Sequence, residues 1–263
     1  MSTLEEVTWN LDDLLEDGTE SDPEAAVVAL LDEADKAAGK FSADYEGKVA
    51  EISGQDLIVA MTRLADISDR AGRAPHYAHP RFAADTAAPA NGALLQMGSE
   101  RATAIQTQLL FFDLEWAALD DERAEELLAT PGLEFAEHHL RNERRYRDHL
   151  LSAPEERIIT EMSVTGSGAW SRLFDELTSA IRVDLPGEDE PVSLDIALSG
   201  LHNPDREVRK ATAEAVTESL QPGLRTRAYV FNTLLQDKAT SDRLRSFPHW
   251  LATRNLSNEA SDE

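Results

Sequence analysis

Residues 155–181 read EERIITEMSVTGSGAWSRLFDELTSAI, and this stretch carries the clearest helical pattern in the chain. Its second half places large apolar residues at steps of four, three and four residues. Side chains spaced in this way lie on one face of an α-helix. The first half repeats the rhythm, so the stretch predicts a long central helix with an apolar face made of Ile158, Ile159, Met162, Trp170, Phe174, Leu177 and Ile181.

Two glycines divide this pattern in its middle, in the run Thr165-Gly166-Ser167-Gly168. Glycine is less favourable than alanine inside a helix by about 1 kcal/mol, so we expect a bend or a break at this point. A bend beside a substrate channel and a kink that only relieves packing both fit the sequence, and we favour the kink. The start of the stretch is well marked, because Ser152 and Glu155 have the spacing of a capping box.

Helix signals also precede the central stretch. Asp22-Pro23 predicts the start of a helix that runs to about Gly47, and Ser53 predicts the start of a second helix that reaches Ile67. From Thr86 to Leu119 we expect the longest helix, followed by two shorter helices that begin near Asp120 and Thr130. The longest helix carries a near-heptad seam, which is typical of a packed helix pair but could also be a partner groove: Leu95, Ala102, Ile105, Leu109, Phe112 and Trp116.

After the central stretch, residues 181–185 and 191–194 flank Pro186-Gly187-Glu188-Asp189, which predicts a β-hairpin. A helix capped by Asn203-Pro204 follows, and a last helix begins at about Pro222 and carries Leu224, Ala228, Phe231 and Leu235. Residues 255–263 have the pattern of a further helix start, which suggests a truncated chain. We therefore predict an all-α fold, an elongated multi-helix array with one small β-hairpin, divided into regions 1–150 and 151–263.

The composition limits the class of protein. The chain has 263 residues, 41% of them hydrophobic, which is enough for a sizeable core. It has no apolar run of about twenty residues and no basic, apolar leader, so we expect a soluble, cytoplasmic protein that does not enter membranes. With 0 cysteines, disulfides and cysteine metal sites are excluded.

The charge is strongly negative, at −25 with a pI of about 4.5. Binding to nucleic acid needs clustered Lys and Arg, so we expect no nucleic-acid partner. An acidic surface with few lysines could suit a salty cytoplasm. It could also reflect the codon usage of a high-GC genome, and we favour this second explanation.

The candidate metal ligands do not have the spacing of a zinc site on a helix. Two histidines four residues apart on a helix, with a glutamate next to the first, form the H-E-x-x-H motif. His76-Tyr77-Ala78-His79 and Glu137-His138-His139 lack this spacing, and Glu134 with His138 is only a carboxylate–imidazole pair. We therefore expect no metal ligand and no catalytic residue in this chain.

Other candidate sites have simpler explanations. Gly166-Ser167-Gly168 lacks the surroundings of a nucleophilic serine and of a phosphate-binding loop. Asp13–Glu24 half resembles a calcium loop, but Leu15 stands where an oxygen ligand is required, so we expect an acidic linker with Trp9 and Leu14 as anchors. A basic cluster could attract a peptide carboxylate, although we favour the neutralisation of nearby acidic helices by its members: Arg141, Arg144, Arg145 and Arg147.

Three runs together carry a family resemblance: AWSRLFDELTSAIRV (169–183), NPDREVRKATAEAV (203–216) and FNTLLQDKATSDRLRSFPHWLATRNLSNEASDE (231–263). With the opening Trp9-Asn10-Leu11-Asp12-Asp13-Leu14, they resemble the oligoendopeptidase F family. These are zinc metallopeptidases of the thimet-oligopeptidase type, hydrolases that cut short peptides inside a deep channel. The resemblance spans most of the chain.

The resemblance implies the N-terminal, largely helical portion of such an enzyme, which forms one wall of the substrate channel. Zinc, the cofactor of the parent enzyme, and the general base would come from a missing C-terminal catalytic portion, so this chain alone should hold no cofactor and be inactive. The implied partners are oligopeptides and that missing portion, and a homo-oligomer could cover the exposed surface. Substrate-binding residues remain unknown. The alternatives are a non-catalytic helical module that binds peptides or proteins, and a salt-adapted scaffold without a ligand.

Overall fold

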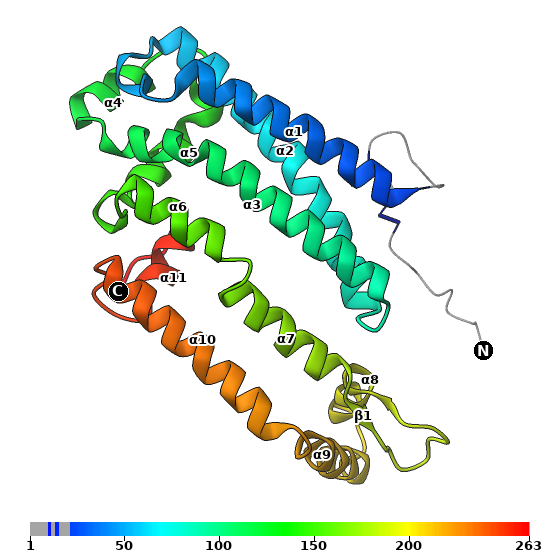
Figure 1. Cartoon of the computed structure of the whole chain (residues 1–263). Helices are drawn as coiled ribbons and strands as arrows, with labels where there is room; N and C mark the ends of the chain where they lie inside the picture. The colour runs from blue at the N-terminus through cyan, green and yellow to red at the C-terminus, as the bar shows by residue number, and fades with distance from the viewer. Residues whose placement is uncertain (1–9, 12–13, 16–21, 263) are drawn as a thin grey trace. The chain divides into compact units, whose positions relative to one another are not determined.

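The structure is a computed structural model that describes residues 10–11, 14–15 and 22–262 (Figure 1). The described part is all-α with one two-stranded sheet, as the sequence predicts. Trp9 and most of the expected acidic linker lie outside the described residues, whereas Leu14 is partly buried and packs against a hydrophobic core. No helix in the described part of the chain combines the length and the apolarity that crossing a membrane requires.

Within the described residues, the chain divides into two compact units. Unit 1 holds the chain up to Asp85, then Ala90–Glu161, and the residues from Leu251 onward. Unit 2 holds Thr86–Pro89 and Met162–Trp250. The division into regions 1–150 and 151–263 stays a prediction.

The helices of unit 1 are α1 (Pro23–Tyr45), α2 (Gly54–Ala84), most of α3 (Pro89–Ala118), α4 (Asp121–Leu128), α5 (Glu134–Arg144), nearly all of α6 (Ala153–Met162) and α11 (Ala252–Ser257). Short 3-10 turns lie at Val49–Glu51 and Arg147–His149. The expected caps are present, because Asp22 accepts a hydrogen bond from Ala25 N–H at 3.0 Å and Ser53 accepts one from Asp56 N–H at 3.1 Å. Local side-chain chemistry therefore fixes where α1 and α2 begin.

Helix α2 is longer than the sequence predicts. It continues through Pro75 and Pro80 to Ala84, and its 31 residues exceed the 30 of α3, which was expected to be the longest helix. A proline inside a helix removes a backbone hydrogen bond and usually ends the helix. Here the second half is packed against the core, where Tyr77 and Phe82 are buried. Tertiary burial thus keeps the helix going where local propensity would stop it.

Aromatic residues of α1 and α3 form the centre of the unit 1 core. Phe41 lies 5.6 Å from Phe112 between ring centroids, and Trp116 is fully buried. The Trp116 indole N–H donates to the Leu140 carbonyl at 2.8 Å, which joins the end of α3 to α5. The buried polar group is therefore satisfied, as a buried tryptophan requires.

The central helix of the sequence pattern is broken where the glycines predict. Helix α6 ends at Met162, and α7 (Ser167–Ser179) begins after a tight turn. The N–H of Gly166 donates to the Met162 carbonyl at 2.8 Å, and the N–H of Gly168 donates to the Ser163 carbonyl at 3.0 Å. A Cβ at position 168 would lie 2.9 Å from the Ser163 oxygen, so the turn requires a residue without a side chain.

Unit 2 contains α7, the strands β1 (Arg182–Val183) and β2 (Val192–Ser193), α8 (Leu194–Ser199), a 3-10 turn (Gly200–His202), α9 (Arg206–Leu220) and α10 (Leu224–Leu244). The strands pair antiparallel and confirm the predicted hairpin. Among the described residues, the hydrophobic cluster beside the hairpin is small, with three buried members: Val183, Ala197 and Val216. Helices α7 and α10 run side by side, with the Trp170 and Tyr229 rings 5.9 Å apart (Figure 1).

Two predicted helix starts are wrong in detail. The cap of α9 is Asp205, which accepts from Glu207 N–H at 2.8 Å. Asn203 lies two residues earlier and accepts from Asp205 N–H at 2.9 Å. Residues 255–262 do not begin a helix, because α11 already ends at Ser257 and Glu259 has a positive φ of 53°. The acidic residues there follow a helix end, and this composition alone could not distinguish an end from a start.

Candidate functional site

The histidines that the sequence singles out lie on two different helices, and all four are exposed: His76 and His79 on α2, His138 and His139 on α5. His76 Nδ1 lies 2.6 Å from the Gly72 carbonyl on its own helix, and His138 Nε2 lies 3.0 Å from a Glu259 oxygen. Glu134 does not pair with His138. Its carboxylate accepts from Gly132 N–H at 2.9 Å, and backbone hydrogen bonds from its own N–H and from Gly132 lower its pKa.

In the part of the chain that the structure describes, no three His, Asp or Glu side chains are grouped so that they could hold a metal ion. A catalytic zinc needs three protein ligands and an open position for water. The described residues therefore do not fit a zinc site.

The arginines of the basic cluster stabilise the fold through ion pairs and hydrogen bonds. Arg141 pairs with Glu125 and Glu137, and its hydrogen bonds lower the pKa of the Glu125 carboxyl. The Arg144 guanidinium donates to the Trp116 and Leu119 carbonyls, each at 2.8 Å, and to Asp121.

Arg147 reaches the same end of α3, where it donates to the Ala117 carbonyl at 2.7 Å. Unpaired carbonyls at a helix C-terminus attract cations. The neutralising role is confirmed for Arg141, Arg144 and Arg147, which pair with acidic side chains. Arg145 donates to the side-chain oxygen of Asn142 at 3.0 Å.

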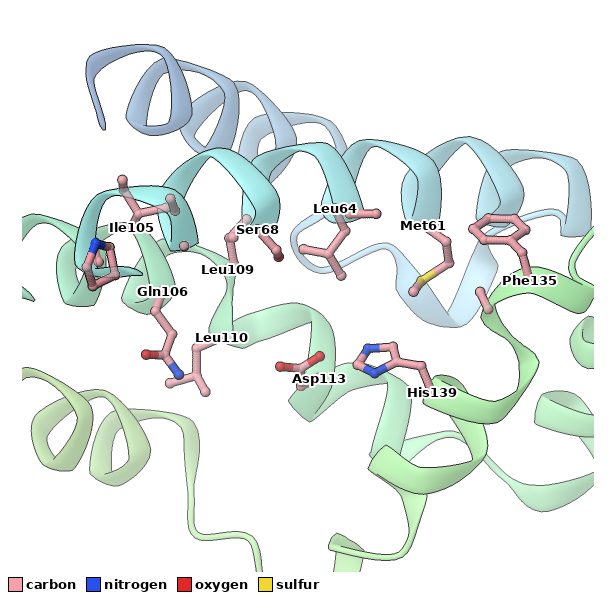
Figure 2. A pocket seen from close by; sticks show the side chains of 16 residues that line it. Met61, Leu64, Ser68, Ile105, Gln106, Leu109, Leu110, Asp113, Phe135 and His139 are labelled. Carbon is pink, nitrogen blue, oxygen red and sulfur yellow. The ribbon is translucent and has the colours of Figure 1, made fainter. Parts of the chain in front are cut away.

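The seam residues of α3 lie in two different environments. Phe112 and Trp116 are buried in the core, while Ala102, Ile105 and Leu109 line a cavity of about 550 Å³ within unit 1. The cavity lies between α2, α3 and α5, and one face of each helix borders it (Figure 2). Helix α2 contributes small residues that leave the space open: Ala65, Ser68, Ala71 and Gly72.

The cavity holds an acidic group in mainly apolar surroundings. Asp113 projects into it from α3, and the His139 ring lies opposite on α5 (Figure 2). Burial, and then the negative charge of Glu143, raise the pKa of Asp113 to about 7. His139 Nδ1 lies 4.0 Å from a Glu143 oxygen. Sequence analysis missed Asp113, although its position three residues after Leu110 places it on the apolar face of α3.

A second feature lies in unit 2, on α10. The residues of its apolar stripe recur at steps of four, three and four, and all are exposed to solvent: Leu224, Ala228, Phe231 and Leu235. The helix instead buries Val230 and Arg227, and the Arg227 guanidinium donates to the Leu220 and Pro222 carbonyls at the end of α9. We call Leu224, Ala228, Phe231 and Leu235 the α10 stripe. An amphipathic helix normally turns such a stripe towards a core or a partner.

Comparisons with known proteins agree on one family. The sequence profile described as Oligopeptidase F matches residues 115–182. Oligopeptidase PepF of Bacillus subtilis (strain 168) is 26% identical over 219 residues, which cover 80% of this chain and 31% of that protein. The matched regions include the basic cluster and the broken central helix.

The crystal structure of oligoendopeptidase-F from Enterococcus faecium has the same fold, with a TM-score of 0.79 at 19% identity over 91% of this chain and 48% of that chain. The chain thus spans about a third of the curated relative and about half of the solved structure.

Proposed function

We propose that this chain, which corresponds to the N-terminal portion of the oligoendopeptidase F family, forms part of the wall that encloses short peptides in an enzyme of that family. The fold likeness and the profile match support this assignment. The printed sequence contains no H-E-x-x-H motif, so zinc and the general base would come from a different portion of the enzyme. In this proposal, region 151–263 is the part that leads towards that catalytic portion.

The observation that carries the proposal is the exposed α10 stripe. Phe231 is 56% exposed and Leu235 is 51% exposed, although both have the spacing of a buried helix face. Monomeric proteins rarely leave such apolar surface open without a partner. A helix that packs one face inside its own unit and offers a second apolar face fits a lobe that is covered by another part of a larger peptidase.

The proposal is tested by removing the apolar character of the stripe. We expect the unmodified chain to bind a hydrophobic dye and to self-associate in light scattering. Phe231→Glu should lower dye binding and association by severalfold, because it places a charge in the middle of the stripe. Gln236→Glu is the matched control, because it adds the same charge at an exposed position of α10 outside the stripe. A wild-type chain that stays monomeric at high concentration without dye binding would contradict the proposal.

A non-catalytic module that binds peptides or protein helices is the second candidate, and the missing H-E-x-x-H motif favours it. The two functions differ in what the gene encodes after codon 263. An H-E-x-x-H motif in the same reading frame would support the enzyme, and a stop codon would support the module.

A further inference from the structure

The cavity of unit 1 has the size and lining of a small-molecule site. Its volume of about 550 Å³ falls within the range of roughly 300–1,000 Å³ that is usual for ligand pockets. Apolar side chains such as Leu64, Ile105 and Leu109 form the walls, and a few polar groups lie among them. Phe135 lines it from α5 and remains 59% exposed. An apolar pocket with few, localised polar groups binds ligands that have an apolar body and one polar end.

Asp113 gives the pocket its charge preference. Among the described residues, no protein cation forms an ion pair or a hydrogen bond with its carboxyl group. The arginines of α5 are engaged elsewhere, Arg141 with Glu125 and Arg144 with Asp121. The titratable groups near the carboxyl are His139 and Glu143 on α5, whereas the lining residues of α2 include none. Two carboxyl groups and one imidazole favour a cation over an anion.

From this geometry we infer that the cavity binds an apolar primary amine, with its ammonium group at Asp113 and its hydrocarbon part between α2 and α3. An ammonium ion donates up to three hydrogen bonds and would pair with a carboxylate that has no partner of its own. A neutral ligand would leave that carboxylate unpaired, and a carboxylate ligand would be repelled by Asp113 and Glu143. The inference does not depend on the proposed function, because the pocket lies wholly within unit 1.

Binding of the amine should weaken as the pH falls, because the surroundings of Asp113 favour its protonated form. Because burial and Glu143 hold the pKa of Asp113 near 7, the carboxyl is largely protonated at pH 6 and largely ionised at pH 8. An alkylamine stays charged over this range, as lysine does. Only the ionised carboxyl attracts the ammonium ion, so the affinity should fall about tenfold from pH 8 to pH 6.

The experiment titrates the whole chain with hexylamine, 1-hexanol and hexanoate and follows methyl NMR signals of Leu64, Ile105 and Leu109. We expect hexylamine to shift these signals at pH 8 with an affinity at least about tenfold higher than that of 1-hexanol. Hexanoate should cause no shift. Equal affinities for the amine and the alcohol, or no shift of these methyl signals with any probe, would overturn the inference.

Variants test whether the probes bind in the cavity, and they distinguish the effect of the Asp113 charge from the effect of the cavity volume. Asp113→Asn should abolish the preference for the amine and its pH dependence while 1-hexanol still binds. Asp175→Asn, on the exposed surface of α7 in unit 2, removes the same charge and should change neither. Ala102→Leu should fill part of the cavity and weaken both probes. An amine preference retained in Asp113→Asn, or undiminished binding in Ala102→Leu, would place the probes elsewhere and overturn the inference.

Discussion

Asp113 stands on the apolar face of a helix, and its surroundings disfavour the charged carboxylate. Its pKa is raised from 3.8 to about 7, first by burial and then by Glu143. The folded protein therefore binds more protons than the unfolded chain between about pH 4 and pH 7. Across this window the free energy of unfolding falls as the pH rises, and above pH 7 the loss is complete.

Asp113→Asn removes this titration. We expect the variant to gain stability over the unmodified chain by about 1–2 kcal/mol more at pH 8 than at pH 5. The full shift would give more, at 1.36 kcal/mol per pKa unit, but Asp113 is only half-buried and water screens part of the effect. Urea unfolding at both pH values measures the difference. If the gain in stability were equal at the two pH values, or larger at pH 5, the folded protein would not destabilise the ionised form of Asp113.

Single residues were predictable where their role is local. The caps at Asp22 and Ser53 follow from sequence, because each side chain accepts a hydrogen bond from the backbone N–H three residues further along the chain. The role of Asp113 was not predictable. Whether an acidic residue on α3 meets water or a cavity depends on the small residues that α2 places opposite, such as Ala65 and Gly72, which are distant in sequence.

The break between α6 and α7 is the element whose geometry depends most on single atoms. Gly168→Ala would place a Cβ 2.9 Å from the Ser163 carbonyl oxygen, which is backbone and cannot move aside easily. We expect a loss of about 1–3 kcal/mol in the free energy of unfolding.

Gly98→Ala provides the matched control, because nothing lies within 4 Å of the added methyl group within α3. It should stabilise the chain by about 0.5–1 kcal/mol. Denaturant unfolding of both variants tests the argument. If Gly168→Ala proved as stable as Gly98→Ala, the close approach of the backbone at the break would not exist.

Helices and strands were predictable from sequence where nearby residues determine where they begin and end. The hairpin and the broken central helix follow from turn residues and glycines. The second half of α2 does not, because the burial of Tyr77 and Phe82 outweighs two prolines. The spacing of apolar residues in α10 predicts a helix but does not predict which of its faces is buried. Sequence alone could not say that the α10 stripe faces solvent while Arg227 and Val230 face the unit.

At the scale of the whole molecule, net charge is the dominant feature. The chain carries 50 acidic and 25 basic residues, so its charges repel one another. Raising sodium chloride from 0.01 M to 1 M shortens the screening length from about 30 Å to about 3 Å. We expect the thermal midpoint to rise over this series. A midpoint that stays constant or falls would show that the acidic surface does not limit stability, and the idea of salt adaptation would lose its basis.

In the function that we propose, this chain contributes a peptide-enclosing wall and not the chemistry of cleavage. The most direct test purifies the chain without a histidine tag, measures its zinc content, and incubates it with a quenched fluorescent peptide in the presence and absence of a chelator. The account predicts no stoichiometric zinc and no chelator-sensitive cleavage, because the printed sequence has no H-E-x-x-H motif and the described residues form no three-ligand group. Stoichiometric zinc together with cleavage that the chelator abolishes would contradict the account.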